Sequence, residues 1–329
     1  MKIRTMIAAM TIAASTIAAS TAWAQEKVTV RLDFLPWGIH AALHLAAEKG
    51  WFKDEGLDVE ISDGKGSNVT IQQVASGEID IGQVQLNVAA VARTKGLPVM
   101  SIAGFVRRGD LGALVPTDSG INSVKDLEGR KVAYVATTSA SVLAEPFFVA
   151  GGADPKKIEL INVDSSSQMS VYNAKTVDAV IMTVPLGIAV AAQTRPSKGI
   201  MLADVGMNLP SYGLITSDTT LKNRAPVLKK FVAVAVKAWD YLYSDPSHID
   251  EGVAAILAQR PNDKLNGDIL KRQVTLYKAF LDTDATKGKK IGWQSDEDWK
   301  IGIATLEKAG LIPAGKQPSD FYTNEFVSE

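Results

Sequence analysis

The sequence predicts an α/β fold in two lobes. Strand-like segments alternate with helix-like segments through the first two thirds of the chain, beginning with 28–34, 39–49 and 57–62. This order is typical of a mainly parallel sheet with helices on both faces. Roughly 305 residues follow the first 24, which is enough for two domains of ordinary size.

Residues 1–24 have the layout of a cleaved secretory signal. Lys2 and Arg4 precede the apolar run 6–19, and the small-residue tripeptide 22–24 follows it. The run of about 14 apolar residues is shorter than the roughly 20 that span a bilayer, so a membrane anchor is the less favoured alternative. We expect cleavage between Ala24 and Gln25.

Composition narrows the function further. The 329 residues contain no cysteine, which excludes disulfides, thiol nucleophiles, cysteine-held metal sites and a lipid-modified cysteine anchor. After residue 24 the net charge is about −3, without a long run of either sign, so nucleic acid and anionic lipid are poor partners. These features predict a monomeric protein that diffuses freely in the periplasm.

The first lobe begins with a strand at 28–34, a loop at 35–38 and a helix at 39–49. A second strand, 57–62, enters the glycine-containing loop 63–68, and a helix then leads to a third strand at 79–82. A further strand is expected at 98–105. Ligands bind at the carboxyl ends of the strands in such sheets, so the loops after these strands are the ones to examine.

The pattern restarts in a second lobe. Strands are expected at 111–115, 131–135, 158–163 and 178–182, with a loop at 136–140 and a helix that ends near 150. We interpret 212–216 as a return to the first lobe, followed by helices at 225–243, 249–258, 267–280 and 296–309. The first lobe is thus 25–113 and 215–329, the second is 114–214, and two crossing segments form a hinge.

Several short segments occur in an order and spacing that resemble one protein superfamily. They are 32–36 (LDFLP), 40–41 (HA), 46–53 (AAEKGWFK), 55–59 (EGLDV), 64–67 (GKGS), 75–82 (ASGEIDIG), 95–99 (KGLPV) and 177–180 (VDAV). The chain resembles the substrate-binding proteins of ABC importers in the nitrate/sulfonate/taurine/pyrimidine-precursor superfamily. The branch of this superfamily that it resembles is called NMT1/THI5-like. The resemblance implies a periplasmic-binding-protein clamshell of type II that closes on a small molecule and docks on a permease/ATPase complex.

The resemblance does not identify the ligand. In the thiamin-pyrimidine branch the opening loop commonly carries Trp-x-x-Asn-x-x-His, whereas this chain has the sequence FLPWGIH at 34–40. The histidine is kept and the tryptophan is moved by three places. After the Asp-Ala-Val-Ile strand, the chain has 183–187 (TVPLG) where that branch tends to carry aromatic and acidic residues, which argues against a pyrimidine precursor.

Candidate ligand-binding residues lie mainly in the loops that follow the predicted strands. Trp37 and Phe34 offer rings that can stack on a planar ligand, and His40 offers a hydrogen bond from the first helical turn. We expect Trp37, as a loop residue, to support little of the core. Ser67 and Asn68 can donate to a ligand, although plain capping of the following helix is an alternative. The full set is Phe34, Trp37, His40, Lys65, Ser67, Asn68, Asn87, Arg108, Thr137, Thr138, Ser139 and Thr183.

The second lobe and the hinge contribute the remaining candidates. The loop 137–139 precedes a helix in the same way as 64–68, and capping alone is again an alternative. Arg108 could clamp a carboxylate, but adjacent charges in a turn are usually a solvated tip. One flat apolar face with many neutral donors favours a small planar ligand, heteroaromatic or anionic, over a sugar or a polyamine.

Metal binding and catalysis are the competing hypotheses. His40, His44 and Glu48 lie on one helical face, but the first and third are about 11 Å apart along the axis, too far for one ion. The eukaryotic thiamin-pyrimidine synthase shares the superfamily fold, yet its cysteine-rich motif is absent here. We therefore expect no metal, no cofactor and no enzymatic activity.

Overall fold

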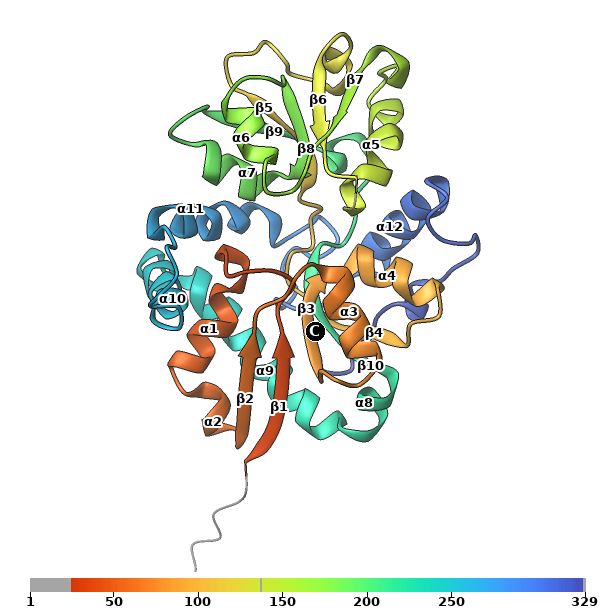
Figure 1. Cartoon of the computed structure of the whole chain (residues 1–329). Coiled ribbons are helices and arrows are strands. Elements are labelled where there is room, and N and C mark those ends of the chain that lie inside the picture. The colour runs from red at the N-terminus through yellow and green to blue at the C-terminus, as the bar shows by residue number, and fades with distance from the viewer. Residues whose placement is uncertain (1–24, 137, 328–329) are drawn as a thin grey trace, which may run out of the picture.

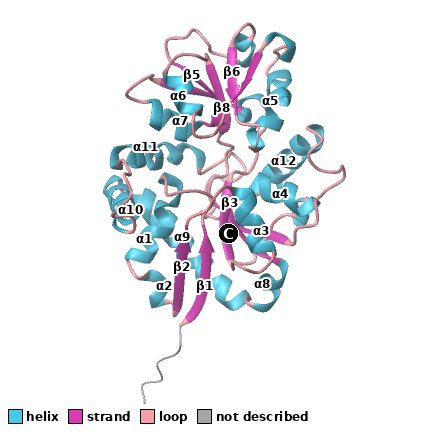
Figure 2. Ribbon diagram, viewed as in Figure 1, coloured by secondary structure: helices cyan, strands magenta, loops and turns pink. Residues whose placement is uncertain are grey.

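The computed structural model describes residues 25–327 except 137. The predicted signal segment 1–24 lies outside the described residues. The described chain forms two lobes, each built on one five-stranded sheet with helices on both faces (Figure 1). This arrangement confirms the predicted two-lobed α/β fold, and Figure 2 shows the sheets enclosed by helices in each lobe.

The sheet of lobe 1 has the order β2-β1-β3-β10-β4. Its strands are β1 (Glu26–Arg31), β2 (Leu57–Ser62), β3 (Ile81–Gln85), β4 (Val99–Gly104) and β10 (Tyr212–Ser217). β1 is parallel to β2 and β3, whereas β10 is antiparallel to both of its neighbours. β10 is therefore the strand by which the chain re-enters lobe 1.

The sheet of lobe 2 has the order β7-β6-β8-β5-β9 and repeats this plan. Its strands are β5 (Leu111–Pro116), β6 (Lys131–Tyr134), β7 (Glu159–Asn162), β8 (Ala179–Thr183) and β9 (Ser197–Met201). β5 is antiparallel to β8 and β9, and it is the strand by which the chain enters this lobe. Residues 114 and 214, the limits expected for lobe 2, fall inside β5 and β10.

Helices α5 (Ser139–Ala150), α6 (Gln168–Asn173) and α7 (Val184–Ala191) belong to lobe 2. Lobe 1 carries the 3-10 helix η1 (Gly38–His40), α1 (Ala41–Glu48), α2 (Trp51–Asp54), α3 (Ser67–Ala75), α4 (Leu86–Thr94), α8 (Asp218–Asn223), α9 (Ala225–Ser244), α10 (Pro246–Ala258), α11 (Gly267–Tyr277) and α12 (Asp296–Lys308). No helix in the described part of the chain is long and apolar enough to span a membrane.

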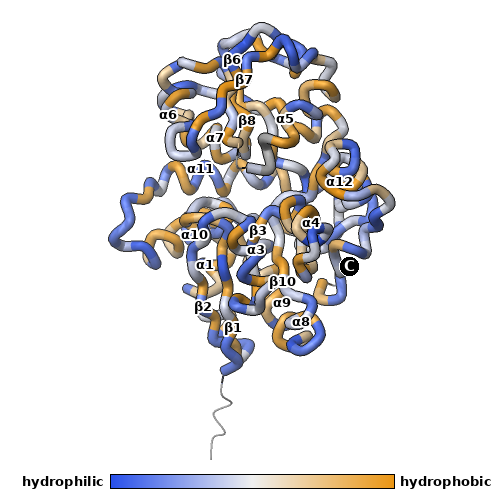
Figure 3. The backbone as a smooth tube through the Cα atoms, turned by 45° about the vertical axis from the view of Figure 1, so that its right-hand side comes forward, coloured by the Kyte–Doolittle hydropathy of each residue, from blue (hydrophilic) through white to orange (hydrophobic). Residues whose placement is uncertain are grey.

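The longest helix, α9, shows how the pattern of apolar residues determines which face of a helix is buried. Leu228, Phe231, Ala235, Trp239 and Leu242 recur at spacings of three or four, and all are buried in the core of lobe 1. One apolar stripe of this kind packs on a sheet while the opposite face meets water. Figure 3 shows the same alternation of hydrophobic and hydrophilic residues along the helices of both lobes.

One strand, β9, was not predicted from the sequence. β9 contains Lys198 and Gly199, which are poor strand formers, and it lies at the edge of its sheet. It forms because β5 offers it an antiparallel partner from Gly112 to Pro116. Its pairing depends on residues about 85 positions earlier in the chain, so no local pattern marks it.

Candidate functional site

The two crossing segments, 105–110 and 206–211, lie side by side between the lobes. The Ser211 amide donates to the Val106 carbonyl at 3.0 Å, and the Val106 amide donates to the Tyr212 carbonyl at 3.0 Å. The strand ends that carry most of the candidate loops lie around these segments (Figure 1). The candidate site is therefore built around the hinge.

An aromatic cluster lies at the lobe 1 side of the hinge. The Trp37 ring is 5.5 Å from that of Tyr212 and 5.7 Å from that of Tyr277, both measured between ring centroids. Trp37 is only 6% exposed and belongs to the main core of lobe 1. The expectation that this loop residue supports little of the core was wrong, because Tyr277, from the distant helix α11, and Tyr212 close over it.

A hydrogen-bonded histidine fixes the loop that carries Trp37. The Trp37 amide donates to Nδ1 of His40 at 3.4 Å, and Nε2 of His40 lies 2.8 Å from Oδ1 of Asp33. If the amide donates to Nδ1, then Nε2 carries the proton that is donated to the Asp33 carboxylate. The His40 side chain is fully buried, and its hydrogen bonds with Trp37 and Asp33 orient this loop.

The glycine loop of lobe 1 lies against the same segment. A Cβ atom on Gly64 would be 2.0 Å from the Leu32 carbonyl oxygen, so only glycine fits at this position. The Gly66 amide donates to the Asp33 carbonyl at 2.6 Å. The glycines predicted to approach a ligand therefore first allow two lobe 1 loops to approach each other.

A second buried carboxylate joins the crossing segments to α11. Asp110 is fully buried, and its two oxygens accept hydrogen bonds from the Ser211 hydroxyl at 2.6 Å and the Tyr277 hydroxyl at 2.7 Å. Its backbone carbonyl accepts from the amide of Val184, the first residue of α7. Burial raises the pKa of Asp110 to about 6. One side chain thus connects both crossings with α11, while its backbone bonds to α7.

Polar side chains from both lobes meet beside this cluster. Nε2 of Gln85, at the end of β3, donates to the Thr183 hydroxyl of lobe 2 at 3.5 Å. Gln85 and Asp33 are also hydrogen-bonding neighbours of the Tyr212 hydroxyl, and burial raises the Tyr212 pKa well above its usual value. The Tyr212 hydroxyl therefore keeps its proton and remains a donor.

The other predicted residues are distributed around this centre. Phe34 is 45% exposed at the tip of the first loop. Ser67 is half-buried, and its hydroxyl accepts a hydrogen bond from the backbone amide of Gln85 at 3.2 Å. Lys65 and Asn68 are exposed. Asn87 is buried at the start of α4, where its own side chain accepts from the Val88 amide.

In the hinge and in lobe 2 the predicted residues are less central. Arg108 pairs with Asp204 of the 3-10 helix η4 (Leu202–Val205) at 2.6 Å. Thr138 is exposed, and its hydroxyl donates to the Val135 carbonyl before α5 begins at Ser139. Thr137 and the side chain of Ser139 lie outside the described residues. Of these candidates, the structure brings Trp37, His40, Ser67 and Thr183 toward one centre.

Four residues of this centre were missed at the sequence level, and a fifth, Asp33, was quoted only as part of a motif. Gln85 ends β3 and Asp33 lies two residues after the end of β1, positions that could have marked both residues. Tyr212 faces Gln85 only through the antiparallel register of β10 and β3. Tyr277 and Asp110 meet across more than 160 positions of sequence, so no local signal exists for that pair.

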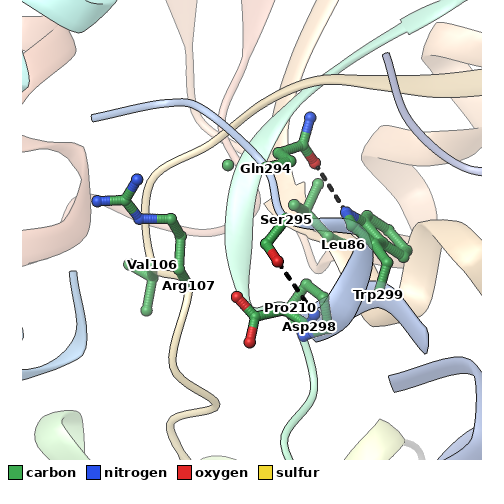
Figure 4. A pocket seen from close by; sticks show the side chains of 9 residues that line it. Leu86, Val106, Arg107, Pro210, Gln294, Ser295, Asp298 and Trp299 are labelled. Carbon is green, nitrogen blue, oxygen red and sulfur yellow. Dashed lines mark hydrogen bonds between the residues drawn. The ribbon is translucent and has the colours of Figure 1, made fainter. Parts of the chain in front are cut away.

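A small cavity lies behind the centre, next to the crossings (Figure 4). Its volume of about 10 Å³ is close to that of one water molecule. Gln294 accepts from the indole N–H of Trp299 at 3.2 Å on one wall, and Arg107 and Asp298 lie on others. The cavity is too small for an organic ligand.

The described residues offer no ready metal site. No group of three or more His, Asp or Glu among them could hold an ion. His44 is buried, and burial lowers its pKa to about 4, so its ring is neutral at pH 7. His40 is held by Asp33 as described above.

Comparison with known proteins identifies a matching family and several related proteins. The profile of the family described as NMT1/THI5 like matches residues 37–249. A formylaminopyrimidine-binding protein of Halalkalibacterium halodurans is 26% identical over 86% of this chain and 86% of its own length. A 4-amino-5-hydroxymethyl-2-methylpyrimidine phosphate synthase of Saccharomyces cerevisiae is 24% identical over 92% of this chain and 88% of its own.

Solved structures show the same fold. The periplasmic aliphatic sulphonate binding protein SsuA of Escherichia coli superposes with a TM-score of 0.69 at 13% identity, covering 90% of this chain and 91% of that one. At this identity the likeness concerns the fold alone. It agrees with the two sheets and the two crossing segments described above.

Proposed function

We propose that this chain, which belongs to the NMT1/THI5-like family, is the substrate-binding protein of an ABC importer and captures a small molecule between its lobes. The observation that carries the proposal is the meeting of polar side chains from both lobes, Gln85 and Thr183, beside the aromatic cluster at the hinge. A ligand held there touches both lobes, so binding favours one lobe arrangement. The formylaminopyrimidine-binding relative supports this assignment.

The ligand we propose is a small planar molecule, and we favour a heteroaromatic one over a simple anion. Phe34 at the loop tip offers apolar surface, and the side-chain amide of Gln85 and the Ser67 and Thr183 hydroxyls offer hydrogen bonds. The buried carboxylate of Asp33 lies in the same centre and would repel a free anion. The name of the formylaminopyrimidine-binding relative agrees with a heteroaromatic ligand, while that of SsuA keeps an anion as the second candidate.

The proposal includes a place and a partner. We propose that residues 1–24 direct export to the periplasm and are removed, and that the mature protein is a monomer that docks on a permease/ATPase complex of the inner membrane. The signal layout in the sequence supports the first part. The fold shared with a periplasmic binding protein supports the second.

An enzyme related to thiamin-pyrimidine synthesis is the alternative, favoured by the yeast synthases among the relatives. The 329 residues contain no cysteine, so the cysteine-rich motif of those synthases has no counterpart here. A binding protein returns its ligand unchanged. A synthase that consumes one of its own histidine side chains in the reaction loses mass from its own chain. Intact mass before and after incubation with a ligand separates these two functions.

A thermal-shift screen followed by calorimetry tests the binding function. The probes are an aminopyrimidine, which represents planar heteroaromatic compounds as a class, methanesulfonate, nitrate, putrescine and glucose. We expect the aminopyrimidine to give the largest rise in Tm, and Thr183→Ala to weaken its affinity by about tenfold because one hydrogen bond is lost. Thr117→Ala, which removes an exposed hydroxyl of lobe 2 far from the hinge, should leave the affinity unchanged. A best ligand that is a sugar or polyamine, or equal affinity in the two variants, would contradict the proposed pocket.

A further inference from the structure

Two arginines hold the beginning of the glycine loop of lobe 1, residues 63–68. The first residue of this loop, Asp63, directly follows β2. Both carboxylate oxygens of Asp63 accept hydrogen bonds from the guanidinium of Arg260, Oδ1 from Nη2 at 2.5 Å and Oδ2 from Nε at 3.2 Å. The backbone carbonyl of Asp63 accepts from Nη1 of Arg31 at 2.9 Å. The side chain and the backbone of Asp63 are therefore both fixed.

The loop itself has little rigidity. Gly66 has a φ of +112°, and a Cβ there would meet nothing within 4 Å. Glycine adopts many backbone conformations at little cost, so contacts from outside the loop must select one of them. The Gly64 amide donates to the Phe34 carbonyl at 3.2 Å, but this acceptor belongs to a second loop. The shape of the glycine loop therefore depends on what holds its two ends, α3 on one side and Asp63 on the other.

Arg260 belongs to a well-anchored part of lobe 1. It lies just after α10, and α10 packs against α1 (Figure 1). Its amide donates to the Leu257 carbonyl at 3.1 Å, and its Nη1 donates to the Gln259 carbonyl at 2.9 Å. A guanidinium that bonds to a carboxylate through two N–H groups fixes the orientation of the carboxylate as well as its position. Arg260 therefore connects the flexible loop to a packed helix.

The far end of the loop reaches the centre at the hinge. Ser67 lies four positions after Asp63 and begins α3, and its hydroxyl accepts from the backbone amide of Gln85 at 3.2 Å. The Gln85 side chain donates in turn to Thr183 of lobe 2. A change in the path of the chain after β2 therefore displaces Ser67 relative to Gln85.

We propose that Arg260 is a positioning residue of the ligand site. It does not touch the ligand, and its ion pair with Asp63 keeps the glycine loop in the shape that presents Ser67 to the centre at the hinge. The inference rests on the proposed function for the ligand and on the described contacts for the loop. Without the ion pair the loop adopts several shapes, and the affinity falls in proportion to the fraction of molecules that keep the binding shape.

Hydrogen–deuterium exchange of the ligand-free protein tests the effect on the loop. We expect Arg260→Gln, which removes the charge and the two-pronged contact, to speed exchange in 64–68. Arg224→Gln is the matched control, because Arg224 pairs with Asp80 in the same lobe and its side chain is similarly half-buried. Asp80 precedes β3, at the amino end of the strand, whereas Gln85 ends it at the centre. The control should leave exchange in 64–68 unchanged.

Calorimetry with the aminopyrimidine tests the effect on binding. We expect Arg260→Gln to weaken the affinity by about tenfold, which corresponds to a binding shape kept by roughly one molecule in ten. Arg260→Lys keeps the charge and loses the two-pronged contact, so it should recover part of the affinity. The double variant Asp63→Asn/Arg260→Gln should bind no more weakly than Arg260→Gln, because both side chains act through one ion pair. Arg224→Gln should bind as the parent does.

Three results would overturn the inference. They are unchanged exchange of 64–68 in Arg260→Gln, faster exchange of this segment in both glutamine variants, and an equal loss of affinity in both. The exchange measurement uses no ligand, so it separates this inference from the proposed function. Faster exchange in Arg260→Gln alone, in a protein that binds none of the probes, would support the role of Arg260 in the loop and contradict the proposed function.

Discussion

Residues near the hinge differ in how much they support the core, and the structure separates them. Trp37 is 6% exposed and packs on Tyr212 and Tyr277, whereas Phe34, three residues earlier in the same loop, is 45% exposed. The sequence predicts Phe34 at the end of a strand, 28–34, and Trp37 in the loop that follows. Either ring could stack on a ligand, and the alternative for Phe34 is that it ends a buried strand. The sequence does not reveal the burial of Trp37, because the covering residues come from β10 and α11.

We expect Trp37→Ala to lower the free energy of unfolding by about 3–5 kcal/mol, since it leaves a large cavity in the core. Phe34→Ala removes an exposed ring and should change the stability by less than about 1 kcal/mol. Urea denaturation of the two variants measures both values. A loss below about 1 kcal/mol for Trp37→Ala would show that the loop is not part of the core.

The buried carboxylate of Asp110 predicts a pH dependence of stability. Its pKa in the folded state is raised from 3.8 to about 6, so the folded protein binds this proton more tightly than the unfolded chain does. The charged form therefore costs stability above pH 6, and this cost is relieved as the pH falls from about 6 to 4. The full effect is about 3 kcal/mol.

Asp110→Asn removes this titration while keeping the size of the side chain. Between pH 7 and 4.5 the unfolding free energy of the parent protein rises because Asp110 binds a proton. We expect the variant to lack this rise. Denaturation of both proteins at the two pH values measures the difference, since other carboxyl groups contribute equally to each. Identical pH dependence in the two proteins would exclude Asp110 as the titrating group.

Among the elements, η1 and α11 determine how the aromatic loop is held. The Gly38 amide donates to Oε1 of Gln273 at 2.8 Å, and a Cβ on Gly38 would lie 2.6 Å from Cβ of Gln273. The helical pattern of 267–280 predicts α11 well, because apolar residues recur at the right spacing above a capping Asn266. That α11 lies against η1 and α7 could not be predicted, because η1 is more than 200 residues away in the sequence and α7 is about 80 residues away.

Gly38→Ala should therefore push α11 away from η1 and lower the unfolding free energy by about 1–3 kcal/mol. Gly267→Ala is the matched control at the start of α11, where the nearest atom to a new Cβ is 3.6 Å away. The control should be neutral or slightly stabilising, because alanine favours the helix over glycine. Equal effects of the two substitutions on thermal denaturation would mean that the contact between η1 and α11 is not tight.

For the whole molecule, sequence order was enough to predict two α/β lobes and the return of the chain through 212–216. The reversed strands β5 and β10 follow the two crossings, one entering each lobe. The centre at the hinge, where we propose that a ligand binds, was only partly predicted. Loops after strands can be predicted from the sequence, but the pairing of Asp110 with Tyr277 cannot. We propose that a small molecule is held by loops of both lobes at the hinge.

Hydrogen–deuterium exchange with the compound that raises Tm most tests this claim directly. We expect binding to slow exchange in 33–40 and 63–68 of lobe 1 and in 183–187 of lobe 2, because both sets of loops would close on one ligand. Protection confined to one lobe would contradict capture between the lobes.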